Sequence, residues 1–234
     1  MWWKDKVCPL SEACPHSGKD KCKMSCVSYY LTRQYVEYSG LPKMAFDDLS
    51  ISPEQIDMDA FMKCKEFKDN ILEHAKKGQG LYIYGRNKGN GKTTWSYKIL
   101  LEYMRLISTS SIGVDKEIPI YYVNVCELFE ELKSNMENKE YTNAIEYAIE
   151  NADIVVFDDI GVEAPTTWVK NKLYAYINKR YNDKRSMIFT SNLSLTELGT
   201  NIDSRIADRI SGVCRPIHIQ GASRRFTKNW WDNK

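Results

Sequence analysis

The chain has 234 residues, of which 43% are hydrophobic and 27% charged, and its formal net charge is +2. This composition excludes a disordered chain and allows one large domain, or one domain of conventional size with a small appendage. The small net charge does not by itself indicate a nucleic-acid-binding protein. The apolar runs are too short to span a membrane and residues 1–5 lack the apolar core of a secretory signal, so we expect a cytoplasmic protein without membrane contact.

Cysteines are concentrated near the beginning of the chain. Of the seven, the first 26 residues contain Cys8, Cys14, Cys22 and Cys26. Thiols stay reduced in the cytoplasm, and so short a stretch cannot build a hydrophobic core, whereas Zn²⁺ held by four thiolates supplies folding free energy directly. The pattern therefore predicts a structural zinc site. The alternatives are His16 in place of one cysteine, unliganded thiols, and an iron–sulfur site.

Helical periodicity follows the cysteines. Between residues 23 and 38, apolar and aromatic side chains recur with the spacing of an amphipathic helix, at Val27, Tyr30, Leu31 and Tyr38. Residues 41–60 show no periodicity and indicate a linker laid over the next domain. A second helix is predicted over residues 60–77, before a glycine at position 78.

A glycine-rich loop follows the short apolar strand that is predicted over residues 81–84. Such a strand, loop and helix form the layout of a phosphate-binding loop, whose backbone N–H groups surround phosphate oxygens. The residues expected to bind nucleotide are Gly89, Asn90, Gly91, Lys92, Thr93 and Thr94. In this arrangement Lys92 contacts the β- and γ-phosphates of the nucleotide, and the Thr93 hydroxyl binds Mg²⁺.

The entrance of this loop departs from the usual pattern. The pattern G-x-x-x-x-G-K-[ST] requires glycine at position 86, where the chain has Arg86 directly after Gly85. A loop with one extra residue at its entrance still brings residues 89–92 to the phosphates, so we expect nucleotide binding. A surface turn that binds nothing is the alternative.

Strands and helices alternate after the loop. This order predicts a parallel sheet covered by helices on both faces. Helices are expected over 95–107, 128–151 with a break near Asn138, 168–181 and 203–210; strands are expected over 118–125, 154–157, 187–190 and 216–219.

Polar residues end two of these strands. Asp158 and Asp159 follow an apolar strand, and the carboxyl ends of parallel strands meet at the ligand crevice. Asp158 is therefore expected to hold Mg²⁺, and Asp159 to orient the attacking water. Glutamate is the usual residue in the second role, so the shorter Asp159 predicts slow turnover. Asn192, at the end of the next strand, is expected to reach the γ-phosphate or the water.

These motifs together carry a family resemblance. The runs YIYGRNKGNGKTT, YVNVCELFEELK, IVVFDDIGVE, FTSN, SRIADRI and GASRR resemble the AAA+ ATPase of bacterial and phage replicative helicase loaders of the DnaC/DnaI type, over about residues 42–226. The resemblance implies an α/β AAA+ P-loop core with a five-stranded parallel sheet in the order 5-1-4-3-2 and no full lid domain. Lys92 and Thr93 then form the Walker A pair, and Asp158 and Asp159 the Walker B pair.

The same resemblance implies three further catalytic positions. Asn192 takes the place of sensor 1, and Arg205 that of an arginine finger offered to a neighbouring subunit. Sensor 2 falls to Arg225, with the adjacent Arg224 as the alternative. The cofactors implied are ATP, Mg²⁺ and, because the cysteine-rich start is similar to the small domain of DnaI-type members, Zn²⁺.

The resemblance also implies a function and a domain division. Residues 1–41 are expected to form a zinc-binding module that contacts the helicase, residues 42–77 a linker and entry helix, and residues 78–234 the ATPase domain. The expected function is ATP-dependent loading of a hexameric replicative helicase onto single-stranded DNA by a loader that assembles into an oligomer on the helicase. Two alternatives are an IstB-like transposition helper ATPase and a nucleotide-binding interaction protein with weak hydrolysis.

Overall fold

The computed structural model describes residues 26–46, 50–110, 116–161 and 165–223. Its centre is a sheet of five parallel strands: β1 (Gly80–Tyr84), β2 (Ile120–Asn124), β3 (Ile154–Asp158), β4 (Ser186–Ser191) and β5 (Cys214–His218). The strand order is β2-β3-β4-β1-β5, which confirms the predicted order 5-1-4-3-2. Because all strands are parallel, their carboxyl ends lie along one edge of the sheet, where the predicted site residues follow them.

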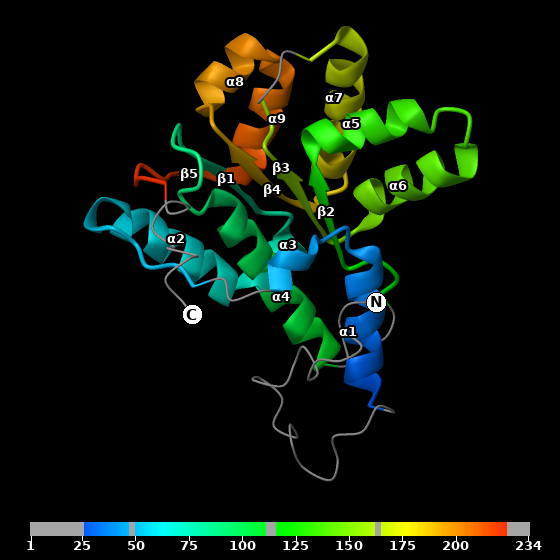
Figure 1. The fold of residues 1–234 in the computed structure, drawn as a ribbon, viewed down its shortest axis with the longest axis horizontal. Helices are drawn as coiled ribbons and strands as arrows, with labels where there is room; N and C mark the ends of the chain where they lie inside the picture. The colour runs from blue at the N-terminus through cyan, green and yellow to red at the C-terminus, as the bar shows by residue number, and fades with distance from the viewer. Residues whose placement is uncertain (1–25, 47–49, 111–115, 162–164, 224–234) are drawn as a thin grey trace, which may run out of the picture.

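Helices cover both faces of the sheet (Figure 1). One hydrophobic cluster joins the sheet to α1 (Val27–Tyr38), α2 (Met58–Asp69), α3 (Ile71–Lys77) and α4 (Lys92–Ser108). The other cluster joins the opposite face to α5 (Val125–Ser134), α6 (Lys139–Asn151), α7 (Thr167–Asn182), α8 (Leu195–Asn201) and α9 (Ser204–Val213). Two 3₁₀ turns, Lys43–Phe46 and Gln55–Asp57, lie between α1 and α2. Alternate residues of each strand face the two clusters, as the β repeat requires.

Two helix predictions need correction. The helix expected over residues 60–77 is two helices that meet at Asn70, whose backbone (φ −110°, ψ 23°) leaves the helical region. Helix α8 was not predicted, although it begins with a capping box in which Ser194 and Glu197 bond each other's backbone N–H groups. The predicted break near Asn138 is confirmed, because the Asn138 side chain accepts from the Tyr141 N–H and caps α6.

A buried arginine fixes where two strands begin. Arg180 on α7 is 0% exposed, and its guanidinium donates to the backbone carbonyl oxygens of Ile149 (2.7 Å), Ala152 (2.8 Å), Asp153 (3.2 Å) and Ser186 (2.6 Å). Burial lowers the pKa of Arg180 to about 9. The side chain ties the end of α6 to the starts of β3 and β4, and thereby helps to position the polar residues at the other ends of these strands.

Helix α1 packs on the same body as the sheet. Leu31 and Tyr35 are buried in the first hydrophobic cluster, and α1 lies against α4 (Figure 1). Val27, Tyr30 and Tyr38 are exposed, so Leu31 alone among the four apolar residues named for this helix faces the core. Directly after the helix, the carbonyl oxygen of Ser39 accepts a hydrogen bond of 2.7 Å from the N–H of Tyr122 on β2.

The predicted zinc ligands fall mostly outside the described residues. Cys8, Cys14, His16 and Cys22 lie in residues 1–25, and Cys26 directly precedes α1 with a half-exposed thiol. In the described part of the chain, no group of three or more His, Cys, Asp or Glu side chains is placed to hold a metal ion. The helices described there also include none with the length and apolar character needed to cross a membrane.

Candidate nucleotide-binding site

The glycine-rich loop connects β1 to α4, as the sequence predicts. Gly89 (φ 72°) and Gly91 (φ 101°) have left-handed backbones, which glycine adopts readily and other residues avoid. Gly91 is the N-cap of α4, and Lys92 is the first residue of this helix. The loop therefore presents backbone N–H groups and a helix N-terminus to one point, which is the arrangement that binds phosphate groups.

Lys92 lies inside the loop. It is 5% exposed, and its ammonium group donates to the carbonyl oxygens of Gly85 (2.8 Å) and Asn87 (3.0 Å) and to Oδ1 of Asn90 (3.3 Å). All three acceptors are uncharged oxygens. These bonds hold the ammonium group inside the loop, where the phosphate-binding pattern predicts that it meets a nucleotide phosphate.

The displaced glycine has a packing explanation. A Cβ atom on Gly85 would clash with the carbonyl oxygen of Ile219, which follows β5 beside the end of β1. Arg86, by contrast, is not among the described non-glycine residues with a positive φ. The chain thus needs its glycine at 85, where two strand ends approach each other, and accepts a side chain at 86.

Asp158 lies at the centre of a hydrogen-bond network between the strand ends. Its Oδ1 accepts from the Thr190 hydroxyl (2.6 Å), and its Oδ2 accepts from the hydroxyls of Tyr122 (2.8 Å) and Thr93 (3.3 Å). Burial raises the pKa of the Asp158 carboxyl, because the ionised form is poorly solvated, while the bonds from Thr190 and Tyr122 lower it and the nearby Asp159 raises it. The net direction is upward from the ordinary value.

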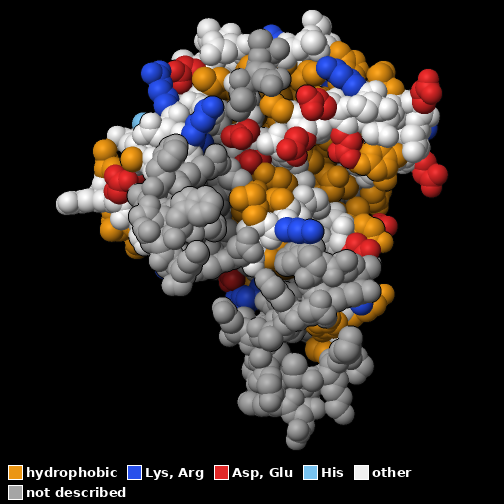
Figure 2. Space-filling model, in the orientation of Figure 1, with side chains coloured by type: hydrophobic (Ala, Val, Ile, Leu, Met, Phe, Trp, Pro, Cys, Tyr) orange, Lys and Arg blue, Asp and Glu red, His pale blue; other side chains and the backbone are white. Residues whose placement is uncertain are grey.

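These oxygen atoms fit a magnesium ion. Mg²⁺ in nucleotide sites is held by one or two protein oxygens together with phosphate oxygens and water. The Thr93 hydroxyl and Asp158 Oδ2, 3.3 Å apart, are close enough to share one ion, directly or through water. Figure 2 shows further acidic side chains together on the face near the ends of β2 and β3.

Asp159 has an unusual backbone. Its φ of 56° places it in the left-handed region, and its N–H donates to the Thr190 hydroxyl at 2.9 Å. A non-glycine residue in this region stores conformational strain, which persists where surrounding contacts enforce it. Thr190 therefore fixes both aspartates, since its hydroxyl donates to one and accepts from the other.

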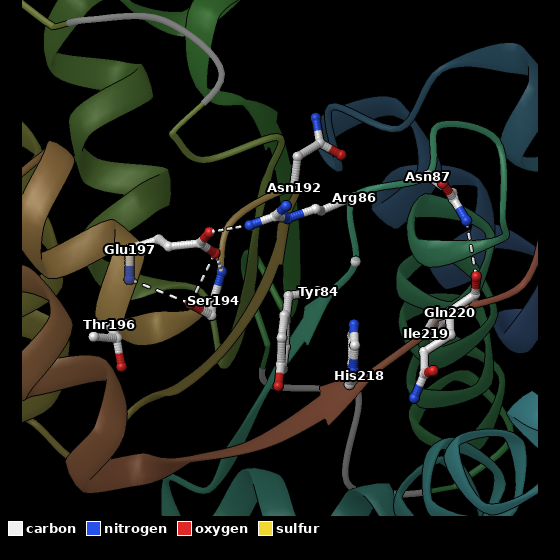
Figure 3. A pocket seen from close by; sticks show the side chains of 11 residues that line it. Tyr84, Arg86, Asn87, Asn192, Ser194, Thr196, Glu197, His218, Ile219 and Gln220 are labelled. Carbon is white, nitrogen blue, oxygen red and sulfur yellow. Dashed lines mark hydrogen bonds and ion pairs between the residues drawn. The ribbon is translucent and has the colours of Figure 1, made fainter.

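A cleft of about 620 Å³ adjoins the entrance of the loop. Figure 3 shows Arg86 extending from the loop toward Glu197 on α8, with which it forms an ion pair of 2.8 Å. Asn192 lines the same cleft, and Tyr84 stacks on His218 with ring centroids 4.7 Å apart. The hydrogen bonds of Ser194 and the ion pair with Arg86 lower the pKa of Glu197 to about 2, so this carboxylate is ionised at neutral pH.

Of the predicted catalytic arginines, the described residues include Arg205. Arg205 lies on α9, where its guanidinium pairs with Asp203 (2.7 Å) and lies 4.5 Å from the centre of the Tyr174 ring. These contacts are with Asp203 and Tyr174 of its own chain, and the role of Arg205 as an arginine finger stays a prediction. Arg224 and Arg225 lie outside the described residues.

Three residues of the site were missed by sequence reasoning. Tyr122 and Thr190 bond the Asp158 carboxylate. Asp57, 3% exposed, accepts from the N–H groups of Gln220 (2.7 Å) and Gly221 (2.9 Å) and so holds the segment after β5. For Tyr122 and Thr190 a signal was available, because polar groups near the carboxyl ends of neighbouring parallel strands meet. Asp57 had none, since nothing local links it to residues so far along the chain.

Comparisons with known proteins show which proteins this chain is similar to. The family model described as "IstB-like ATP binding protein" matches residues 89–230, which is more than half of the chain. The replicative helicase loader DnaI of Bacillus subtilis (strain 168) is 26% identical over 194 residues, or 77% of this chain. The chain spans 58% of the length of that relative.

Two solved structures share the fold. The DnaC helicase loader has a TM-score of 0.62 at 23% identity, with 76% of this chain and 99% of that chain covered. The structure of DnaI has a TM-score of 0.60 at 24% identity, with 77% and 95% covered. With more than half of its length matched by the family model, the chain belongs to the family of IstB-like ATP-binding proteins.

Proposed function

We propose that this protein binds and hydrolyses ATP and uses it to load a replicative DNA helicase onto single-stranded DNA. The observation that carries the ATPase part is the meeting of Lys92, Thr93 and Asp158 at one end of the sheet. The loader part is supported by the similarity to DnaI in sequence, at 26% identity, together with the fold shared with DnaC.

In this proposal each residue of the site has its own role in binding or hydrolysing ATP. The Lys92 ammonium group exchanges its carbonyl partners for the β- and γ-phosphates, and the N–H groups of residues 89–93 surround the same oxygens. Thr93 and Asp158 hold Mg²⁺, which when bound neutralises charge that develops on the phosphates. Asp159 orients the attacking water, and Asn192 contacts the γ-phosphate or that water. Asp159 is one methylene shorter than glutamate, so turnover without partners is slow.

Two further contributions complete the site in an assembly. Arg205 of one subunit reaches the γ-phosphate bound by its neighbour, and Arg225 contacts the phosphates within its own chain. The protein therefore hydrolyses ATP efficiently only as an oligomer on the helicase, and hydrolysis acts as a timer for release. This scheme places the protein in the cytoplasm, where the replicative helicase works.

The proposal includes the domain division predicted from the sequence. Residues 1–41 form a module that binds Zn²⁺ through Cys8, Cys14, Cys22 and Cys26 and contacts the helicase. Residues 42–77 join it to the ATPase domain of residues 78–234, and the helices α1, α2 and α3 of these two stretches pack in the same hydrophobic cluster as the sheet. Exposed Tyr30 and Tyr38 on α1 are apolar surface that such a contact would bury.

Copurification tests the loader function. The purified full-length protein is mixed with the replicative helicase of its host, with ATP and Mg²⁺, with a non-hydrolysable ATP analogue, or without nucleotide, and complexes are separated by size. We expect a complex with nucleotide, and helicase transfer onto single-stranded DNA when ATP is present. Failure to bind the helicase under all three conditions would overturn the loader function and leave ATP binding to be judged separately.

A second candidate follows from the family model. The matched family model is IstB-like, and the alternative implied by the resemblance is an IstB-like transposition helper ATPase, which would act with a transposase on duplex DNA. Stimulation of ATP hydrolysis by duplex DNA, without stimulation by the helicase, would favour that function. Nucleotide binding without any turnover would instead favour an interaction protein.

A further inference from the structure

Tyr122 on β2 lies between the end of α1 and Asp158. Its side chain is 8% exposed, and its hydroxyl donates to Oδ2 of Asp158 at 2.8 Å. The same oxygen accepts from the Thr93 hydroxyl at 3.3 Å. Tyr122 therefore bonds the carboxylate oxygen that faces the magnesium position, on the side away from Thr190.

The tyrosine hydroxyl is itself held in place. Tyr97 on α4 donates to it at 3.3 Å, and the two rings lie 5.2 Å apart at an angle of 54°. Because Tyr97 fills one acceptor position, the single proton of the Tyr122 hydroxyl points to Asp158. Groups that orient a metal ligand in this way are known to change metal affinity strongly when they are removed.

The backbone of Tyr122 carries the second connection. Its N–H donates to the carbonyl oxygen of Ser39 at 2.7 Å, directly after α1. Ser39 is 0% exposed, and a Cβ atom on the neighbouring Gly40 (φ +68°) would clash with the Tyr122 carbonyl oxygen. One residue of β2 thus contacts the end of α1 through its backbone and the Walker B carboxylate through its side chain.

We propose that Tyr122 is a positioning residue for Asp158, and that it links magnesium binding to the seating of α1 on β2. The proposal rests on the proposed ATP function, since it concerns the metal that accompanies the nucleotide. A partner that shifts α1 would move the backbone of Tyr122 and, through its hydroxyl, the carboxylate. Binding at the outer face of α1 would in this way adjust the nucleotide site without contacting it.

The first test separates metal from nucleotide. Affinity for a fluorescent ATP analogue is measured with Mg²⁺ and with EDTA, for the unaltered full-length protein and for Tyr122→Phe. Phenylalanine keeps the ring and removes the hydroxyl. We expect the gain in affinity given by Mg²⁺ to fall by about tenfold, while affinity in EDTA stays the same. Tyr121→Phe is the matched control, because its side chain belongs to the opposite hydrophobic cluster on the same strand.

The second test concerns the link to α1. Gly40→Ala forces a side chain against the Tyr122 carbonyl, and Gly78→Ala creates the same strain (φ +68°) against Lys184, far from the site. We expect Gly40→Ala to lower the gain in nucleotide affinity given by Mg²⁺ several-fold, and Gly78→Ala to leave that gain unchanged. In the Tyr122→Phe background Gly40→Ala should add no further loss, because the connection is already absent.

The outcomes separate this proposal from the ATP function. If no protein binds the nucleotide analogue, the ATP function fails. The positioning role is overturned, while ATP binding stands, by either of two results for Tyr122→Phe. In one, Mg²⁺ raises its nucleotide affinity as much as it does for the unaltered protein; in the other, its affinity falls by the same factor in Mg²⁺ and in EDTA. If the losses from Gly40→Ala and Tyr122→Phe add fully in the double variant, the link to α1 is overturned.

Discussion

The hydroxyl of Thr93 lies 3.3 Å from the carboxylate of Asp158, although the two residues are separated by 65 positions in the sequence. Thr93 follows β1 and Asp158 ends β3, and β4 lies between these strands. The pairing therefore depends on the strand order and register of the sheet.

Lys92→Ala should lower ATP affinity roughly a hundredfold or more, because it removes the charge that meets the β- and γ-phosphates. The protein should stay folded, since the hydrogen bonds of the Lys92 ammonium group to Gly85, Asn87 and Asn90 lie within the loop and not in the hydrophobic core. Titration with a fluorescent nucleotide, beside a thermal melt, measures both. Lys98→Ala, on the same helix but beyond the loop, is the control and should bind normally. A folded Lys92→Ala protein with unchanged affinity would refute the nucleotide site.

Arg180→Met should lower the free energy of unfolding by about 3 kcal/mol. Methionine fills much of the volume but leaves the carbonyl oxygens of residues 149, 152, 153 and 186 without their donor. Lys179→Met removes a neighbouring, exposed cation that pairs with Asp183, and it should change stability far less than Arg180→Met. Urea denaturation of both variants gives the comparison. Equal stability of the two would show that the buried guanidinium is dispensable.

The purified protein should contain about one zinc ion per chain if the cysteine-rich start binds zinc as predicted. Removing the metal should unfold the region around these cysteines and leave the ATPase domain folded, because the ion supplies the folding free energy of so short a module. Elemental analysis and circular dichroism before and after chelation test this. Cys22→Ser should lose the metal, whereas Cys126→Ser on α5 should keep it. Iron in place of zinc would favour the iron–sulfur alternative.

Arg205→Ala should leave ATP binding by the single chain unchanged and reduce helicase-stimulated hydrolysis at least tenfold, because an arginine finger completes the neighbour's site. Arg209→Ala, one turn further along α9, is the control and bonds Asn178 and Asp208 within its own chain. Mixing Arg205→Ala with Lys92→Ala should partly restore hydrolysis, since each protein supplies what the other lacks. Mixed assemblies that stay inactive would argue against action between subunits.

Tyr30→Asp should weaken helicase binding without changing the melting temperature, because Tyr30 is 64% exposed on the outer face of α1. Leu31→Asp should instead destabilise the fold, since Leu31 is 9% exposed and packs in the core. Pull-downs with the helicase and thermal melts of both variants distinguish partner binding from packing. If Tyr30→Asp captures the helicase as well as the unaltered protein, this face of α1 is not the contact.

Much of the fold could be read from the sequence. Strand and helix positions follow from the β and helical repeats, and the strand order from the resemblance carried by the motifs. The break at Asn70 could not be read in this way, because the apolar pattern continues across it. Arg180 had no signal either, since its acceptors are backbone carbonyls that only the packed α6, β3 and β4 bring together.

The sequence predicts the residues proposed to bind nucleotide, but it does not identify Tyr122 and Thr190, whose hydroxyls bond Asp158. Lys92 and Thr93 belong to one local loop motif and Asp158 ends an apolar strand, and the structure brings Thr93 and Asp158 together. Tyr122 belongs to an aromatic strand whose residues are expected to pack in the core, and its hydroxyl acquires a role only because Asp158 lies on the adjacent strand. The catalytic roles of Asp159, Asn192, Arg205 and Arg225 stay predictions.

The bond between Ser39 and Tyr122 also bears on how the protein can be divided. Strand β2 is at one edge of the sheet, and an uncovered edge strand invites pairing with strands of other molecules. Residues 39–40 cover part of that edge. A fragment that starts at residue 42, the predicted domain boundary, would expose it together with the surface left by Leu31 and Tyr35, and would tend to aggregate. A fragment that starts at residue 26 keeps the edge protected and is the better boundary for isolating the ATPase body.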